Sequence, residues 1–170
     1  KYSSMILYGP PGSGKTSLAN IISSNSDNFF VKISAVTSGT KEIKEIVELA
    51  KDNLSMYNKR TILFIDEIHR FNKMQQDYLL EFVENGDIIF IGATTENPAY
   101  EVNNALLSRV MTVKLNDITE SDIFKLLKRT MQDKHRGLGD LEIDISDEVL
   151  EYIAEKAFGD IRYSLRNIGE

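Results

Sequence analysis

Short apolar runs alternate with amphipathic stretches over the first two-thirds of the chain. The runs lie at residues 5–8, 29–33, 61–65, 88–91 and 110–115. The second, third and fourth runs are dense in Phe, Ile and Val, which is typical of strands that are buried on both faces. Alternation of strands with helices is the signature of βαβ units on a parallel sheet. The pattern therefore predicts an α/β core built on a five-stranded parallel sheet.

Helical periodicity fills the stretches between the runs. In residues 43–54, apolar side chains recur at helical spacing and form one stripe, made of Ile43, Ile46, Val47, Ala50 and Leu54. A later stripe of Met74, Tyr78 and Phe82 has the same character, and Gly86 can end that helix in a left-handed cap. We therefore expect helices on both faces of the sheet.

The pattern changes after the fifth run, where strand-like segments stop. Residues 119–122 read Thr-Glu-Ser-Asp, which is typical of a capping box that opens a helix. Ser146 is expected to cap a second helix, and a third is expected to begin near Gly159. The sequence thus predicts an α/β core over residues 1–116 and a small all-helical lid over residues 117–170.

A complete phosphate-loop motif follows the first run. Residues 9–16 read GPPGSGKT, which matches G-x-x-x-x-G-K-[ST] between an apolar strand and a helical stretch. Gly12 and Gly14 allow successive backbone N–H groups to point inward and form an anion nest. Lys15 is expected to contact the β- and γ-phosphates, and the Thr16 hydroxyl to ligate Mg²⁺. We predict an ATP and Mg²⁺ site with nucleotide contacts from Gly9, Pro10, Pro11, Gly12, Ser13, Gly14, Lys15, Thr16 and Ser17.

Two acids end the third run. Asp66 and Glu67 follow residues 61–65, and the carboxyl ends of strands are where open α/β sheets bind ligands. Asp66 is predicted to hold Mg²⁺ through water, and Glu67 to be the general base that polarises the attacking water. The alternative is that both acids merely cap the next helix, which is less favoured after a phosphate loop. Glu67 also favours a hydrolase over a P-loop kinase, because a kinase should exclude water and no acceptor site is evident.

Further polar groups occur where a γ-phosphate and its water are expected. Thr95 or Asn97, after the fourth run, can orient that water, although both are also common turn residues. Arg109 ends a short apolar segment, and Arg162 lies early in the last expected helix. An arginine aimed at a γ-phosphate accelerates hydrolysis and can come from a neighbouring subunit. Without a family pattern, a solvated surface arginine is the commoner interpretation of each.

Composition narrows the classes of function. The chain has no cysteine, which excludes disulfides, thiolate zinc sites and cysteine nucleophiles. No apolar run approaches the roughly 18 residues of a membrane span, and no signal peptide opens the chain, so a cytoplasmic protein without a membrane partner is expected. The net charge of −6 argues against a surface that is basic throughout. A local basic cluster could still bind DNA, although most such clusters are merely solvated. Its residues are Lys125, Lys128, Arg129, Lys134, His135 and Arg136.

Taken together and in order, these motifs resemble the AAA+ superfamily over nearly the whole chain. GPPGSGKT, LFIDE, GATTEN, LLSR and GDIRYSLRN look like its Walker A, Walker B, sensor 1, arginine-finger and sensor 2 elements. Residues 33–43, 64–80 and 91–109 are very similar to the replication-associated recombination protein A family, the bacterial relatives of the Werner helicase-interacting protein. The resemblance implies a P-loop core with a helical lid, and catalytic roles for Lys15, Glu67, Thr95, Arg109 and Arg162.

The resemblance also implies partners. Family members are DNA-dependent ATPases at stalled or gapped replication forks, where they act on single-stranded/double-stranded junctions. They work with single-stranded DNA-binding protein and assemble as homo-oligomers, typically tetramers, in the nucleoid. The family has a segment before the first strand that helps to hold adenine and a C-terminal oligomerisation region. Here only Lys1 to Ser4 precede the first run and the chain stops at Glu170, so we expect a piece of a longer protein.

Two other readings of the motifs stay open. A Holliday-junction branch-migration motor shares the Asp-Glu-Ile-His-Arg pattern at residues 66–70. The other reading is an ATP-switched scaffold that hydrolyses little ATP, like some clamp-loader subunits. The presence of Glu67 and Arg109 argues against it. The role of His69 and Arg70 also stays open, since they can face nucleotide, DNA or a neighbouring subunit.

Overall fold

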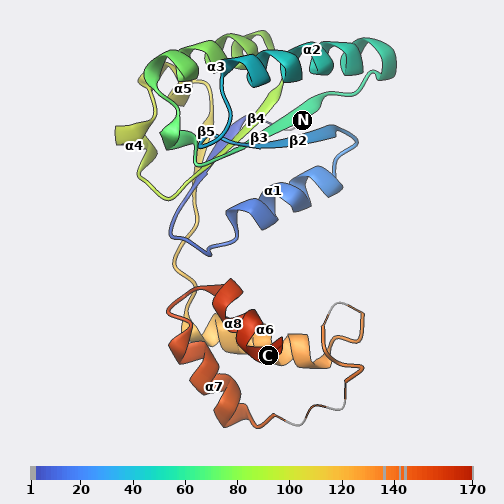
Figure 1. Cartoon of the computed structure of the whole chain (residues 1–170), viewed down its shortest axis with the longest axis vertical. Helices are drawn as coiled ribbons and strands as arrows, with labels where there is room; N and C mark the ends of the chain where they lie inside the picture. Colours follow the sequence, from blue (N-terminus) through green and yellow to red (C-terminus); the bar gives the residue numbers. More distant parts are fainter. Residues whose placement is uncertain (1–2, 136, 142, 144, 170) are drawn as a thin grey trace. The chain divides into compact units, whose positions relative to one another are not determined.

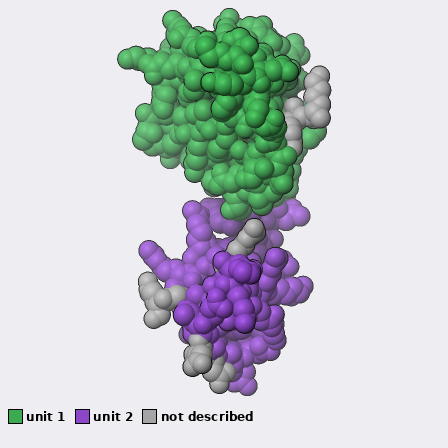
Figure 2. All heavy atoms as spheres, turned by 90° about the vertical axis from the view of Figure 1, so that its right-hand side faces the viewer, with its two compact units in different colours: residues 1–9, 14–115 green, residues 10–13, 116–170 purple. Residues whose placement is uncertain are grey.

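The computed structural model describes residues 3–135, 137–141, 143 and 145–169 (Figure 1). They form two compact units (Figure 2). The first unit contains residues up to Gly9 and residues 14–115, and the second contains residues 10–13 and 116–170. Each unit has a hydrophobic core of its own.

The first unit is built on a sheet of five parallel strands. These are β1 (Met5–Tyr8), β2 (Phe29–Ser34), β3 (Thr61–Asp66), β4 (Ile89–Thr94) and β5 (Met111–Lys114). Their order across the sheet is β2-β3-β4-β1-β5, and every pair is parallel. The five-stranded parallel sheet expected from the sequence is confirmed.

The strand order decides which polar strand ends become neighbours. β3, which ends in Asp66, does not adjoin β1, because β4 lies between them. Tyr8, the last residue of β1, is instead paired with Thr94, the last residue of β4. The end of β4 is therefore the direct neighbour of the phosphate loop.

Helices cover both faces of the sheet, as expected. The helical segments of this unit are α1 (Lys15–Ser24), α2 (Thr40–Tyr57), η1 (Ile68–Arg70), α3 (Lys73–Asn85), α4 (Pro98–Glu101) and α5 (Asn104–Leu107). Figure 1 shows α1 on one side of the sheet and α2 with α3 on the other. Alternate residues of β3 supply the two cores: Leu63 and Ile65 pack with α2 and α3, while Ile62 and Phe64 pack with α1. Both faces of the strand are thus buried, which explains its continuous apolar sequence.

Two residues of the predicted helical stripes are not buried. Leu54 near the end of α2 is 41% exposed, and Met74 near the start of α3 is 71% exposed. The buried residue in the last turns of α2 is instead Asn53, whose amide donates a hydrogen bond of 3.1 Å to the Thr61 hydroxyl. The stripe prediction was wrong at these two positions because the buried face of each helix passes through nearby polar residues, Asn53 on α2 and Gln76 on α3.

The second unit is helical, with α6 (Glu120–Gln132), α7 (Asp147–Lys156) and α8 (Ile161–Gly169). Its core contains Ile123, Leu127, Leu150, Ala154 and Ala157. The small all-helical part expected after the α/β core is confirmed. No helix of the described residues is long and apolar enough to cross a membrane.

The starts of α6 and α7 differ. Thr119 and Asp122 form the predicted capping box, in which the Thr119 hydroxyl accepts the Asp122 N–H and the Asp122 carboxylate accepts the Thr119 N–H, both at 3.2 Å. The Thr119 hydroxyl and N–H donate to this carboxylate and hold the pKa of Asp122 below its ordinary value. Ser146 occupies the N-cap position of α7, but among the described atoms its side chain makes no capping hydrogen bond. The expectation of a Ser146 side-chain cap was therefore wrong.

Candidate functional site

The phosphate loop joins the end of β1 to the start of α1. Gly9, Gly12 and Gly14 all have positive φ angles, of 155°, 76° and 89°. At Gly9 a side chain is also excluded by space, because a Cβ atom would lie 2.3 Å from the Leu115 carbonyl oxygen. Gly14 is the N-cap of α1, so the loop ends at the first turn of a ten-residue helix. The N–H groups of a first turn have no intrahelical acceptor, which suits an anion.

Lys15 is directed into this loop. Its side chain is buried, with 8% of the residue exposed, and its Nζ donates a hydrogen bond of 2.8 Å to the Gly9 carbonyl oxygen. Lys15, the first residue of α1, is thus hydrogen-bonded to Gly9, the first residue of the loop. Thr16 is half-buried and Ser17 is exposed on the same first turn.

The backbone adopts an unusual conformation at Glu67, directly after the end of β3. Asp66 is half-buried, and its Oδ1 accepts the Glu67 N–H at 3.2 Å. Glu67 has a φ angle of 57°, in the left-handed region that non-glycine residues seldom occupy. Such a conformation costs about 1–3 kcal/mol and is concentrated at functional sites. It turns the chain sharply out of the strand and into η1.

His69 links Glu67 to β4. Its Nε2 lies 3.3 Å from Glu67 Oε2, and its Nδ1 lies 2.8 Å from the Thr94 hydroxyl oxygen. Thr94 is fully buried, and its hydroxyl oxygen also accepts the Glu96 N–H at 3.0 Å. Sequence reasoning left His69 without a role and did not single out Thr94. Only the pairing of strands brings these residues together.

Thr95 and Asn97 follow β4 directly. Thr95 is half-buried and Asn97 is exposed. The Asn97 side chain accepts the Ala99 N–H at 3.0 Å and so caps α4. Asn97 is therefore engaged as a helix cap, while Thr95 lies at the same edge of the sheet as the phosphate loop and Glu67.

Arg109 lies at the opposite edge of the sheet. It precedes β5, whose first residue, Met111, is paired with Met5 at the start of β1. The phosphate loop follows the end of β1, roughly 10 Å further along at about 3.3 Å per residue. The Arg109 Nε donates a hydrogen bond of 2.7 Å to Glu84 on α3. The structure therefore keeps Arg109 apart from the phosphate loop of its own chain.

A buried glutamine fixes the segment that carries Arg109. Gln76 on α3 is 3% exposed, and its amide nitrogen donates to the carbonyl oxygens of Phe71 at 2.9 Å and Glu101 at 3.1 Å. Its amide oxygen accepts the Asn103 N–H at 2.8 Å. Gln76 thus ties the turn after η1 to the α4–α5 segment.

In the second unit, Arg162 is paired locally. Its N–H donates to Asp160 Oδ1 at 2.8 Å, and its guanidinium Nε lies 3.7 Å from the same oxygen. The Arg162 side chain is 77% exposed. It is thus open to solvent at the start of α8.

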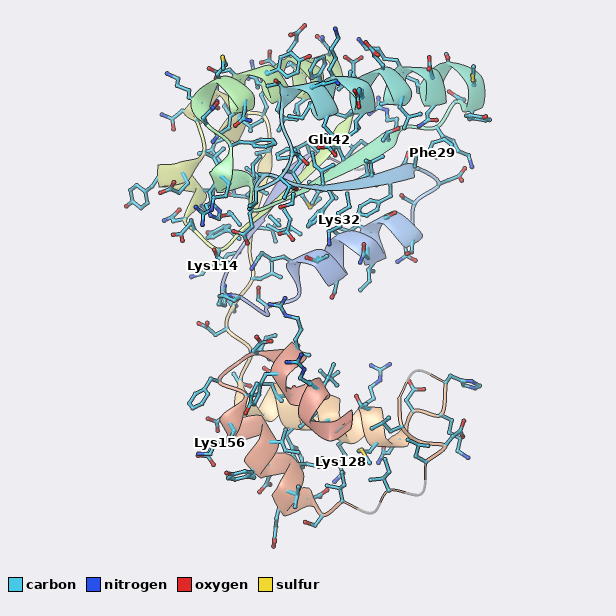
Figure 3. All side chains as sticks on the ribbon, in the orientation of Figure 1. Phe29, Lys32, Glu42, Lys114, Lys128 and Lys156 are labelled. Carbon is cyan, nitrogen blue, oxygen red and sulfur yellow. The ribbon has the colours of Figure 1, made fainter. Side chains whose placement is uncertain are left out.

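The basic cluster of the second unit is only partly engaged. Lys128 on α6 (Figure 3) is bonded to Asp147 at 2.6 Å and lies over the Phe124 ring. Lys125 and Arg129 are exposed on the same helix, four positions apart along one face. Lys134 and His135 are also exposed, and Arg136 lies outside the described residues.

Comparison with known proteins agrees with this geometry. Residues 5–116 match the family described as "ATPase family associated with various cellular activities (AAA)". The chain is 50% identical over 97% of its length to "Replication-associated recombination protein A" of Escherichia coli K12, of which it covers 37%. It is 48% identical over 95% of its length to "ATPase WRNIP1" of Dictyostelium discoideum, of which it covers 18%. The chain thus spans little more than a third of the first relative and less than a fifth of the second.

A solved structure has the same fold at lower identity. The RuvB Holliday junction branch migration motor of Thermotoga maritima superposes with a TM-score of 0.77 and 30% identity, over 96% of this chain and 52% of that one. The resemblance to the replication-associated recombination protein A family is confirmed, and the branch-migration motor shares the fold at lower sequence identity.

Proposed function

Since this chain belongs to the AAA family of ATPases, we propose that it binds ATP with Mg²⁺ and hydrolyses it to remodel DNA at stalled or gapped replication forks. One observation carries the catalytic part of the proposal. The phosphate loop, the Asp66–Glu67 turn and Thr95 follow β1, β3 and β4, which end at one edge of the sheet in the order β3-β4-β1. Ligands of open α/β sheets bind at this edge.

In this proposal the phosphates occupy the loop of residues 9–16. Backbone N–H groups of the loop and the first turn of α1 receive phosphate oxygens, and Gly9 holds the Lys15 ammonium where it meets their charge. Thr16 and Asp66 supply the hard oxygen donors that Mg²⁺ prefers, and a magnesium ion bound with nucleotide needs only one or two of them.

Hydrolysis then needs an oriented water and a base. Glu67 accepts a proton of the attacking water while its oxygen bonds to the γ-phosphorus, the bond from that phosphorus to the oxygen bridging to the β-phosphate breaks, and ADP leaves with the bridging oxygen. Thr95 orients the water. Charge that develops on the γ-phosphate is stabilised by Arg109 of a neighbouring subunit, because the register of β1 and β5 separates Arg109 from its own loop. We assign Arg162 of the helical unit to the γ-phosphate as well, on the strength of its motif.

The DNA part of the proposal rests on relatives and on charge. The name of the 50% identical relative refers to replication and recombination. Lys125 and Arg129 offer an exposed basic face on α6 for phosphate contacts. We propose further that the intact protein acts in the cytoplasm at the nucleoid, as a homotetramer and together with single-stranded DNA-binding protein.

A branch-migration motor is the second candidate function, because a RuvB structure matches over 96% of the chain. Steady-state ATP hydrolysis by the intact protein, measured with gapped duplex, with four-way junction and without DNA, separates the two. We expect several-fold stimulation by gapped duplex and less by the junction. Stimulation by the junction alone favours the motor, and absence of any DNA effect contradicts both. A variant with Lys125→Ala and Arg129→Ala should lose the stimulation but keep the DNA-free rate.

A further inference from the structure

We propose that His69, held by Thr94, is a positioning residue that orients the Glu67 carboxylate, so that the end of β4 sets the rate of ATP hydrolysis. This inference rests on the proposed function, in which Glu67 is the base. It assigns His69 and Thr94 no contact with ATP. Their effect is exerted entirely through Glu67.

The contacts form one continuous chain. The Glu96 N–H donates to the Thr94 hydroxyl oxygen at 3.0 Å, which lies 2.8 Å from His69 Nδ1, and His69 Nε2 lies 3.3 Å from Glu67 Oε2. Burial decreases along it: Thr94 is fully buried, the His69 side chain is 11% exposed and that of Glu67 is 35% exposed. This series of contacts therefore runs from the interior of the sheet to the Glu67 carboxylate, which water can reach.

The Thr94 hydroxyl is placed to fix the orientation of the His69 ring. Its oxygen accepts the Glu96 N–H and lies 2.8 Å from His69 Nδ1, so one hydrogen bond joins the hydroxyl to the imidazole. With Nδ1 held in this way, His69 Nε2 lies 3.3 Å from Glu67 Oε2. Thr94→Val removes the group that holds Nδ1.

Orientation matters for Glu67 because a long, partly exposed side chain has several rotamers of similar energy. The contact with His69 is made by Oε2, so Oε1 is the oxygen that we propose accepts the proton of the attacking water. Displacement of the base by about 1 Å can lower the catalytic rate on the order of 10²-fold. Holding one carboxylate oxygen is therefore sufficient to affect turnover without affecting ATP affinity.

Thr94 also connects this series of contacts to the phosphate loop. Its carbonyl oxygen accepts the Gly9 N–H at 3.3 Å, while its side chain contacts His69. Gly9 in turn receives the Lys15 ammonium. A single residue thus connects the loop proposed to hold the phosphates with the residue that orients the proposed base, which gives the sheet a direct route from bound nucleotide to Glu67.

The test compares His69→Ala, Thr94→Val and Thr94→Ser in the intact protein. We expect His69→Ala and Thr94→Val to lower kcat about 10-fold or more, with the KM and the Kd for ATP changed less than about twofold. Thr94→Ser restores the hydroxyl and should recover most of the rate. Thr61→Val is the matched control, because Thr61 is also fully buried on a strand with a bonded hydroxyl, but at the other end of β3. It should leave kcat unchanged.

Glu67→Gln separates this inference from the proposed function. If Glu67→Gln keeps full turnover, Glu67 is not the base and the proposed mechanism fails. If Glu67→Gln is inactive while His69→Ala and Thr94→Val keep the wild-type kcat or exceed it, only the positioning role is overturned. Equal losses in Thr94→Ser and Thr94→Val, in proteins with unchanged melting temperatures, would also overturn it. In the Glu67→Gln background, His69→Ala should cause no further loss, because both act through one carboxylate.

Discussion

At the residue scale, the proposed site depends on side chains with different tasks and different surroundings. Lys15 is buried in its loop and bonded to a backbone carbonyl, whereas Glu67 is partly exposed and reached through His69. The first arrangement suits a fixed charge that binds phosphates. The second suits a group that must accept a proton from water. Binding and chemistry should therefore be separable by single substitutions.

Lys15→Ala should remove most ATP binding and leave the fold intact. A charge-assisted hydrogen bond is worth about 1.5–3 kcal/mol, so the Kd for ATP should rise at least about 10-fold. Titration with a fluorescent ATP analogue measures the Kd, and circular dichroism checks the fold. Lys73→Ala, which removes an exposed lysine at the start of α3, is the control and should bind normally. Tight binding by a folded Lys15→Ala protein would disprove the phosphate-loop assignment.

The sequence predicts some residues of the site and misses others, depending on whether the pattern that reveals them is local. GPPGSGKT and the Asp66–Glu67 pair are local patterns, because a loop or a strand end positions neighbouring residues together. The His69–Thr94 contact joins residues 25 positions apart and depends on β4 lying next to β3. Strand order is a non-local property that no short motif contains. The sequence therefore indicated Thr95 and missed Thr94.

At the element scale, the strands were predicted more reliably than the helix ends. Short apolar runs between amphipathic stretches mark strands directly, and all five strands form where expected. A helix stripe drawn from apolar residues alone misses buried polar residues, and Leu54 and Met74 are exposed because Asn53 and Gln76 take the inward positions. Capping depends on side-chain geometry, so Thr119 caps α6 while the Ser146 side chain does not cap α7.

The capping box of α6 gives a stability prediction. Thr119→Ala should lower the free energy of unfolding of the helical unit by about 1 kcal/mol, because the Asp122 N–H loses its acceptor. Ser146→Ala is the matched control and should cost less than Thr119→Ala. Urea unfolding followed by circular dichroism measures both. Equal losses in the two variants would show that the box contributes nothing.

The same box predicts a pH dependence. The folded pKa of Asp122 lies below its ordinary value of 3.8, so its stabilising effect is present above that value and is lost as the pH falls through the folded pKa. The difference in stability between wild type and Asp122→Asn should therefore be constant near neutral pH and shrink in acid. A difference that grows as the pH falls would contradict the direction of this shift.

At the scale of the whole molecule, the position of Arg109 supports the proposal that catalysis needs an assembled protein. Arg109 precedes β5 and the phosphate loop follows β1, so the two lie at opposite edges of one sheet. The Arg109 guanidinium is bonded to Glu84, and in the proposed mechanism it exchanges that partner for a γ-phosphate. A neighbouring subunit can present its nucleotide to this edge.

Mixing two inactive variants tests this arrangement. Arg109→Ala and Glu67→Gln proteins should each be inactive in the intact protein. Mixed subunits should recover partial ATPase activity, because some interfaces join an intact Arg109 to a site with an intact Glu67. Arg162→Ala mixed with Glu67→Gln is a useful comparison. Mixtures that exchange subunits yet recover no activity would place Arg109 in its own site or outside catalysis.

The central claim is that this chain hydrolyses ATP with Glu67 as the base at the carboxyl edge of its sheet. Single-turnover hydrolysis by wild-type and Glu67→Gln protein, each saturated with ATP and Mg²⁺, tests it most directly. We predict that Glu67→Gln binds ATP with an affinity within about twofold of wild type, while hydrolysis slows by about 10²-fold or more. Hydrolysis at the wild-type rate by the Glu67→Gln protein would contradict the claim.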